Sequence, residues 1–241
     1  MTVRSRLGGL IVASLVLGGC ALPRFGAPRP ASRQAGHTLA LWQGTVIAAL
    51  VVGVIVWSLI IWSIVRYRRR SEDVPNQKPE NIPIEILYSI IPILIVAGLF
   101  AFTLRTQHET TQVAKRPQLV VDVIGFQWQW QFRYRGEGIT VTGDSEGKRP
   151  QLVLPVGETV QLNLIAADVN HSFWVPRFLS KRDLIPGVRN RINVNVTELG
   201  TFVGRCAEFC GLDHWRMNFE VHAVSKAAYR TWLRDQQGSR Q

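Results

Sequence analysis

Two long segments without a charged residue constrain the fold of this chain more than any other feature. Residues 39–65 and residues 86–104 are uncharged and rich in Leu, Ile and Val. About 20 apolar residues in a helix cross the hydrocarbon core of a bilayer, so both segments are predicted to be transmembrane helices. Pro92 lies inside the second segment, and a membrane helix tolerates such a proline when neighbouring helices pack against it. We therefore expect a two-helix transmembrane hairpin.

The flanks of the first helix predict its orientation. Trp42 and Trp62 lie near its two ends, and aromatic side chains of this kind favour the membrane interface. An arginine cluster at positions 66, 68, 69 and 70 follows the helix directly. By the positive-inside rule, residues 66–85 form a cytoplasmic loop and the chain after the second helix lies outside. The sequence therefore predicts a multi-pass protein of the cell membrane with its C-terminal domain on the outer face.

Glu85 is placed at the cytoplasmic start of the second helix. A carboxylate in the first turn of a helix is favoured by the helix dipole. An ionisable group at the edge of a membrane segment can instead take part in proton uptake. Its position alone favours the first role.

The N-terminus resembles the signal sequence of a bacterial lipoprotein. Arg4 and Arg6 precede the apolar stretch 7–17, which is too short to cross a bilayer, and Gly-Gly-Cys20 follows. This pattern resembles a lipobox, which implies that residues 1–19 are removed and that Cys20 is lipid-modified. A plain signal peptide or a signal anchor is the alternative. Residues 20–38 are rich in Pro, Gly, Ala and Arg and are predicted to be a flexible tether.

Beyond residue 104 the pattern changes to that of β-strands. Residues 126–134 alternate aromatic with polar side chains, which is typical of a half-buried strand. Further strands are predicted at residues 119–124, 151–154, 159–165, 191–196, 201–205 and 218–224. Short strands at this spacing favour a β-sandwich or barrel over residues 115–225. A short C-terminal helix and tail are expected over residues 226–241.

Candidate metal ligands are concentrated between Cys206 and Met217. This segment also holds Cys210 and His214, and His171 lies upstream. Sulfur and imidazole ligands select copper, zinc or iron–sulfur centres, and the thioether favours copper. If Cys20 carries a lipid, the other two of the three cysteines remain as a pair.

Two thiolates can bridge two copper ions. Each ion then needs one imidazole, from His171 or His214, and Met217 can cap one of them. A backbone carbonyl such as that of Glu208 can cap the other. Such a filled shell leaves no position for a substrate, so the centre is expected to relay electrons. A Cys206–Cys210 disulfide and a structural Cys₂His₂ zinc site are the alternatives.

Together these residues resemble subunit II of the haem–copper respiratory oxidases, in particular the cytochrome c oxidases with a binuclear copper A centre. The resemblance covers nearly the whole mature chain. It rests on the helical hairpin and on residues 127–130, 171–176, 181–187 and 204–217. The family implies a cupredoxin-like Greek-key β-barrel on the outer membrane face. It also implies that two copper ions are bound by His171, Cys206, the Glu208 carbonyl, Cys210, His214 and Met217.

The resemblance implies roles for further residues and for partners. Trp128 matches the residue at which electrons enter from cytochrome c, and Glu85 matches the mouth of a proton channel into subunit I. The Glu208 side chain matches a ligand to a magnesium ion shared with subunit I. Asp168 and Asp183 match acidic positions near the donor face and the subunit I contact. The implied complex contains subunit I, which holds haem, and subunit III.

The expected function is therefore that of the electron-accepting subunit of a proton-pumping cytochrome c oxidase. Electrons pass from a cytochrome c through this chain to haem in subunit I, where oxygen is reduced to water. One departure from relatives is that Arg133 and Arg135 follow the aromatic strand, where a carboxylate is common. This puts docking of a basic cytochrome c in doubt.

Other functions fit the sequence less well. A quinol oxidase subunit II would lack the copper ligands. A membrane-anchored copper-delivery protein would need an exchangeable site rich in Met and His, and the chain has only two Met. The copper domain of nitrous oxide reductase belongs to a soluble enzyme with a large extra domain. The net charge of +11 includes no run of Lys and Arg interleaved with aromatic residues, so nucleic acid is not an expected partner.

Overall fold

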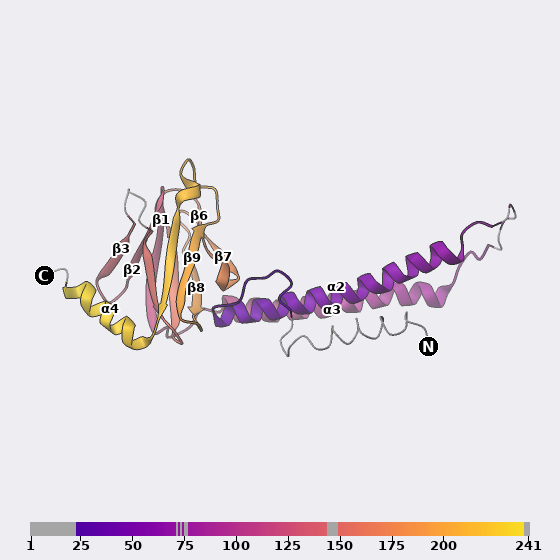
Figure 1. Cartoon of the computed structure of the whole chain (residues 1–241), viewed down its shortest axis with the longest axis horizontal. Coiled ribbons are helices and arrows are strands. Elements are labelled where there is room, and N and C mark those ends of the chain that lie inside the picture. The colour runs from indigo at the N-terminus through magenta and orange to yellow at the C-terminus, as the bar shows by residue number, and fades with distance from the viewer. Residues whose placement is uncertain (1–22, 71, 73, 75–76, 144–148, 239–241) are drawn as a thin grey trace, which may run out of the picture.

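The structure, a computed structural model, describes residues 23–70, 72, 74, 77–143 and 149–238. It consists of a long helical hairpin and a β domain at one end of that hairpin (Figure 1). The predicted signal sequence 1–19 and Cys20 lie outside the described residues.

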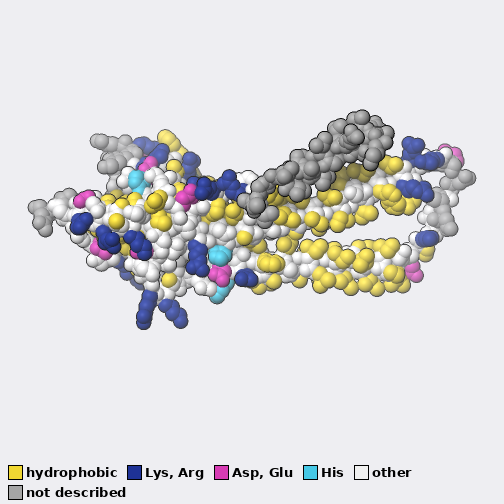
Figure 2. All heavy atoms as spheres, turned by 60° about the horizontal axis from the view of Figure 1, so that its bottom comes forward, with side chains coloured by type: hydrophobic (Ala, Val, Ile, Leu, Met, Phe, Trp, Pro, Cys, Tyr) yellow, Lys and Arg dark blue, Asp and Glu magenta, His cyan; other side chains and the backbone are white. Residues whose placement is uncertain are grey.

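The hairpin consists of α2 (Arg33–Arg66) and α3 (Ile82–Thr111). Both helices extend beyond the uncharged segments, and both are long and apolar enough to cross a membrane. Apolar side chains are exposed along their length, and charged side chains gather at the two ends (Figure 2). This distribution fits a bilayer, because lipid rather than protein would cover the apolar surface.

The end of the hairpin distant from the β domain carries an N-terminal cap on α3. The side chain of Asn81 accepts a hydrogen bond from the Ile84 amide, and Glu85 accepts one from the Asn81 amide at 2.9 Å. Such reciprocal bonds satisfy amides that a helix start leaves unpaired. Pro92 lies inside α3, as predicted.

Two five-stranded sheets form the β domain. The first has the order β3-β2-β1-β5-β8 and the second the order β4-β10-β9-β6-β7. Pairing is antiparallel except for β1 with β5 and β4 with β10, which are parallel. The first sheet comprises β1 (Leu119–Phe126), β2 (Gln129–Tyr134), β3 (Ile139–Thr142), β5 (Thr159–Ala166) and β8 (Asn190–Asn195). The second comprises β4 (Gln151–Pro155), β6 (His171–Val175), β7 (Ser180–Leu184), β9 (Gly200–Cys206) and β10 (Asn218–Val224). The expected cupredoxin-like domain with a C-terminal helix, α4 (Lys226–Gly238), is confirmed.

The prediction of a single strand over residues 126–134 is wrong. The chain reverses at Gln127 and Trp128, which form the turn between β1 and β2, and Phe126 pairs with Gln129. Alternation of aromatic and polar residues continues through the turn, so the pattern does not reveal it. Strands β3, β6 and β7 were not predicted. The other predicted strands are present, β10 with the predicted bounds and the rest with ends shifted by at most two residues.

An aromatic cluster fills the space between the two sheets. The Phe219 ring stacks on Phe173 at 4.9 Å between centroids and meets Trp130 and Phe132 edge-on. Gly204 on the neighbouring strand β9 lies directly beneath this ring, so an added Cβ would overlap Phe219. The core therefore requires glycine at position 204, which lies two residues before Cys206 at the end of β9.

The prediction of a flexible tether is wrong for residues 31–38. Helix α2 already begins at Arg33, and Ser32 caps it by accepting a hydrogen bond from the Ala35 amide. Ala31 is fully buried and its amide donates to the Arg177 carbonyl, while Ser32 bridges to Val196. We call residues 23–32 the strap, because they join the start of α2 to the β domain.

We predict that Gly204→Ala destabilises the β domain by about 1–3 kcal/mol, because the new methyl group must displace the Phe219 ring from a close-packed core. Urea unfolding of the full chain in detergent, followed by near-UV circular dichroism, measures the change. The control is Val203→Ala on the exposed side of the same strand, which is expected to cost less. Equal stability of Gly204→Ala and the parent chain would contradict this account of the core.

Candidate metal centre

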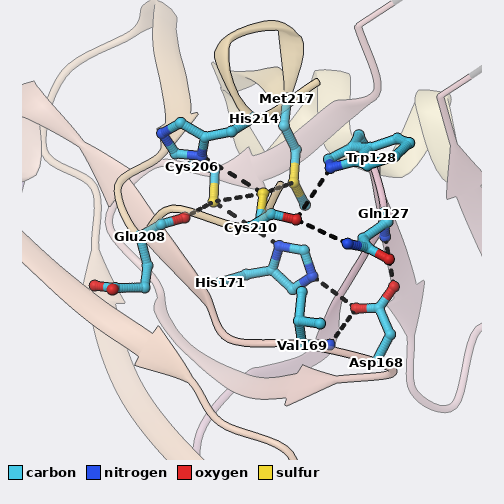
Figure 3. A network of polar contacts seen from close by, with 10 residues as sticks. All are labelled: Gln127, Trp128, Asp168, Val169, His171, Cys206, Glu208, Cys210, His214 and Met217. Carbon is cyan, nitrogen blue, oxygen red and sulfur yellow. Dashed lines mark hydrogen bonds and ion pairs between the residues drawn. The ribbon is translucent and has the colours of Figure 1, made fainter. Parts of the chain in front are cut away.

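The predicted ligands come together at one end of the β domain. His171 is the first residue of β6, and Cys206 is the last residue of β9. These strands pair side by side, with Phe173 opposite Cys206. Cys210, His214 and Met217 lie on the loop that leads from β9 to β10 (Figure 3).

The donor atoms form a compact cluster around two free thiols. The sulfur atoms of Cys206 and Cys210 lie 3.9 Å apart. Cys206 Sγ lies 3.9 Å from His171 Nδ1 and 3.2 Å from the Glu208 carbonyl oxygen. Cys210 Sγ lies 3.5 Å from His214 Nδ1 and 3.8 Å from Met217 Sδ. All six predicted donors are therefore brought together, and four of them, namely His171, Cys206, Cys210 and Met217, are buried.

Backbone hydrogen bonds hold the ligand loop closed. The Cys206 amide donates to the Met217 carbonyl at 3.0 Å, which joins the two ends of the loop. The next amide, of Ala207, donates to the Ser172 carbonyl on β6 at 3.0 Å. The indole of buried Trp130 donates to the same Met217 carbonyl at 3.2 Å. The loop is thus fixed to both strands that carry the other ligands.

Asp168 orients the His171 ring. Its carboxylate lies 2.8 Å from His171 Nε2 and accepts hydrogen bonds from the amides of Gln127 and Val169 at 2.7 and 2.6 Å. A carboxylate on Nε2 fixes the proton there and leaves Nδ1 free to bind a metal. The resemblance placed Asp168 near the donor face as an acidic position, whereas here its oxygens are engaged within the site.

Electrostatics distinguish the two thiols. Burial raises the pKa of Cys206, but its contacts with His171 and its hydrogen bonds with the backbone of Glu208 and Ser172 together outweigh burial and lower the pKa below its usual value. Burial and then the neighbouring Cys206 thiolate raise the pKa of Cys210 to about 12. Two adjacent thiolates repel each other, and a bound metal cation would stabilise both.

The pKa values of the supporting pair move in opposite directions. Burial lowers the pKa of His171, but hydrogen bonds with Cys206 and Asp168 outweigh burial and raise it. Burial raises the pKa of Asp168, but hydrogen bonds from His171 and the two amides outweigh it and lower the pKa. The Asp168 carboxylate is therefore held ionised beside the imidazole.

The turn that carries Trp128 contacts the site directly. The Trp128 indole N–H donates to the Cys210 carbonyl at 3.1 Å, and the Gln127 side-chain amide donates to the same oxygen at 2.9 Å. Gly211 makes this approach possible, because its φ is +116° and an added Cβ would lie 3.1–3.2 Å from both side chains. Trp128 itself is half-buried.

Glu208 points in two directions (Figure 3). Its carbonyl oxygen faces Cys206, whereas its carboxylate points away from the sulfur atoms. That carboxylate is partly exposed and lies 3.9 Å from the Lys181 ammonium, which is also 3.7 Å from Asp183. Asp183 in turn accepts a hydrogen bond from the Ser172 hydroxyl at 2.7 Å.

Other residues of interest lie outside this cluster. Glu85 is in the first turn of α3, and α3 begins at the end of the hairpin distant from the β domain (Figure 1). Arg135 is paired with the buried carboxylate of Asp122 at 2.8 Å, so it is not a free cation, whereas Arg133 is exposed on β2. Gln127 and Gly211 were not predicted as site residues, because their roles arise from a turn that contacts a loop more than 80 residues away.

The donor set fits copper. Two thiols, two imidazoles and a thioether are soft or intermediate ligands, which favour copper or zinc over hard cations. The sulfur–sulfur separation of 3.9 Å excludes a disulfide in this structure, since such a bond measures about 2.05 Å. The thioether contact with Cys210 favours copper over a structural zinc site.

Sequence comparisons agree with this arrangement. The family models "Cytochrome C oxidase subunit II, transmembrane domain" and "Cytochrome C oxidase subunit II, periplasmic domain" match residues 24–105 and 146–224, respectively. The "Probable cytochrome c oxidase subunit 2" of Streptomyces coelicolor is 38% identical over 278 residues, which cover 97% of this chain and 87% of that protein. The "Cytochrome c oxidase subunit 2" of Mycobacterium tuberculosis is 34% identical over 295 residues, with 97% and 80% covered.

Among solved structures, the periplasmic domain of subunit II of cytochrome oxidase from Bradyrhizobium japonicum matches with a TM-score of 0.48 and 26% identity. That match covers 53% of this chain and 99% of the other. From the sequence relatives, which match along almost its whole length, the chain belongs to the cytochrome c oxidase subunit II family and is a subunit of that oxidoreductase complex.

Proposed function

We propose that this chain accepts electrons one at a time from a cytochrome c and passes them to haem in subunit I of a proton-pumping oxidase. The observation that carries the proposal is the pair of buried thiols 3.9 Å apart, flanked by the imidazoles of His171 and His214. The proposed ligands of two copper ions are His171, Cys206, the Glu208 carbonyl, Cys210, His214 and Met217. When bound, such a pair of ions supplies a one-electron relay with little rearrangement.

The protein around the cluster supports a relay rather than an exchangeable store. Cys206, Cys210 and Met217 are at most 7% exposed. The Cys206–Met217 backbone hydrogen bond closes the loop and holds its two ends together. A copper-delivery protein would need accessible ligands, and the buried positions argue against that function.

Trp128 is the proposed point at which electrons enter. Its half-buried ring lies between solvent and the site, and its indole hydrogen bond ends on the backbone of a ligand residue, Cys210. One hydrogen bond and the backbone and side chain of Cys210 thus connect the Trp128 indole to a ligand sulfur, and this short path supports the proposal. In the same part of the chain, Leu212 and Trp215 are 82% and 74% exposed, as expected of a surface that a donor covers.

A second surface is proposed to contact subunit I. Phe209 is 78% exposed beside the outward carboxylate of Glu208. A carboxylate that points away from the sulfur cluster can bind a magnesium ion together with oxygen ligands from subunit I. Lys181 and Asp183 border this surface. Subunit III is expected in the same complex on family grounds alone.

We further propose that the β domain lies on the outer face of the cell membrane. The arginines at positions 66, 68, 69 and 70 follow α2 at the end of the hairpin distant from the β domain, and the positive-inside rule places that end in the cytoplasm. Glu85 lies at that end, which fits a proton-channel mouth, although its bond to the Asn81 amide also gives it a capping role.

The strap supports lipid modification of Cys20. The indole of Trp42 donates to the Arg24 carbonyl, and the Gln43 side chain donates to the Pro23 carbonyl, both at 3.2 Å. Pro23 is thereby held at the level of an interfacial tryptophan on α2. Three residues span at most about 11 Å, so a lipid on Cys20 can reach the outer leaflet.

We predict that the full chain, loaded with copper and freed of excess ions, holds two copper ions. Cys210→Ser is expected to hold at most one, because a bridging thiolate is lost while His171 and Cys206 remain. Inductively coupled plasma mass spectrometry with a protein assay gives the ratio. A parent chain that retains zinc and no copper would contradict the proposal.

Trp128→Ala is expected to slow electron input from reduced cytochrome c by more than about tenfold, with unchanged copper content. The reason is that the indole and its bond to the Cys210 carbonyl are lost. Stopped-flow absorbance at saturating donor measures the rate. Trp215→Ala is the matched control, because its ring is 74% exposed on the proposed donor surface, and only the donor concentration needed for half-saturation should change. Loss of copper from Trp128→Ala would mean that this residue has a structural role instead.

Asp168→Asn is expected to weaken copper binding by about 10–100-fold, because His171 and two amides lose a carboxylate acceptor. Competition with a chelator of known affinity measures the change. Asp235→Asn on α4, distant from the site, is the control and should bind copper normally. Unchanged affinity of Asp168→Asn would show that the carboxylate does not orient His171.

A further inference from the structure

An apolar groove runs between the two membrane helices, next to the β domain. Its volume is about 560 Å³, which lies within the range of small-molecule sites. The groove is lined by Leu41, Gly44 and Ala48 on α2 and by Leu94, Gly98 and Phe102 on α3. None of these six side chains is charged, so the part of the groove that they line suits an apolar group.

Two glycines keep the groove open. An added Cβ at Gly44 or at Gly98 would meet no atom within 4 Å. The helices therefore do not need glycine at these positions in order to pack against each other. The missing side chains leave space that another molecule can fill.

Polar groups close the outer end of the groove. His37 on α2 lies there together with Arg105 and Glu109 on α3. Arg105 directly follows the uncharged segment of α3, so these groups lie where the membrane surface is expected. Histidine and charged side chains gather in this region, where the apolar helices meet the β domain (Figure 2). Among the described residues, none of these three side chains takes part in an ion pair.

We infer that this groove binds one phospholipid with a zwitterionic, primary-ammonium headgroup, such as phosphatidylethanolamine. One acyl chain lies between Gly44 and Gly98, and Arg105 with His37 faces the phosphate. Glu109 faces the ammonium group. The headgroup thereby supplies a negative charge to Arg105 and a positive charge to Glu109, which an apolar occupant could not do.

Two other occupants fit less well. A helix from another subunit would fill the apolar part of the groove. An apolar helix would also cover Arg105 and Glu109 without supplying a group of opposite charge to either side chain. The strap, which leads back toward Cys20, is held by Trp42 and Gln43. The residues of α2 that line the groove are spaced three or four positions apart, beginning at His37, so they share one face of the helix. Trp42 and Gln43 lie on the other side of α2. The strap is therefore held away from the groove.

Native mass spectrometry of the full chain in detergent tests the inference. The probes are phosphatidylethanolamine and phosphatidylglycerol with identical acyl chains. One molecule of phosphatidylethanolamine should be retained, and Gly98→Leu should reduce retention by more than about tenfold, since the new side chain fills the groove. Gly53→Leu on α2, outside the groove, is the matched control and should retain the lipid. Glu109→Gln should abolish the preference for phosphatidylethanolamine over phosphatidylglycerol.

Several results would overturn the inference. One is equal retention by Gly98→Leu and Gly53→Leu, with both variants unfolding at the same temperature. Another is that the isolated chain retains the lipid but the assembled oxidase does not. That result would show that a helix of another subunit occupies the groove in the complex. A third is that the only lipid retained by the chain survives denaturation, because that lipid would be the covalent anchor of Cys20 and the groove would hold none. Copper content is measured in parallel and is expected to be the same in all variants.

Discussion

The structure depends on the closure of one loop at the end of the β domain. The Cys206 amide bonds to the Met217 carbonyl, and this single contact brings both ends of the ligand segment together. The thiols of Cys206 and Cys210 are thereby held 3.9 Å apart in a buried position, where two thiolates would repel each other without a cation. Gly204 below the loop and the Phe219 ring provide the close-packed base on which this arrangement rests.

A network of hydrogen bonds extends from the site to the surface. Asp168 joins the His171 ring to the turn of Gln127, and the next residue, Trp128, bonds to the backbone of Cys210. The groups that orient a ligand and the group proposed to receive electrons therefore belong to one connected structure. At the membrane side, the strap joins α2 to the β domain through Ala31 and Ser32. The site is thus held in a fixed position relative to the hairpin.

Much of this could be predicted from the sequence, because the signals are local. The uncharged segments predict the helices, and Cys206, Cys210, His214 and Met217 lie within twelve residues. Long-range contacts could not be predicted in this way. The turn at Trp128 is hidden by a strand-like alternation that continues through it. The strap has a linker-like composition, yet Ala31 is buried because its backbone bonds to Arg177 and Thr197, which are far away in the sequence. Asp168 resembled a surface charge, and only its contacts reveal a supporting role.

Electron paramagnetic resonance of the copper-loaded full chain tests the central claim most directly. One unpaired electron shared equally by two copper nuclei gives a seven-line hyperfine pattern, and a site with both thiols between the ions is expected to give it. The Cys210→Ser chain should lose the pattern. A four-line spectrum from the parent chain would show a single copper ion and would contradict the proposed two-copper relay.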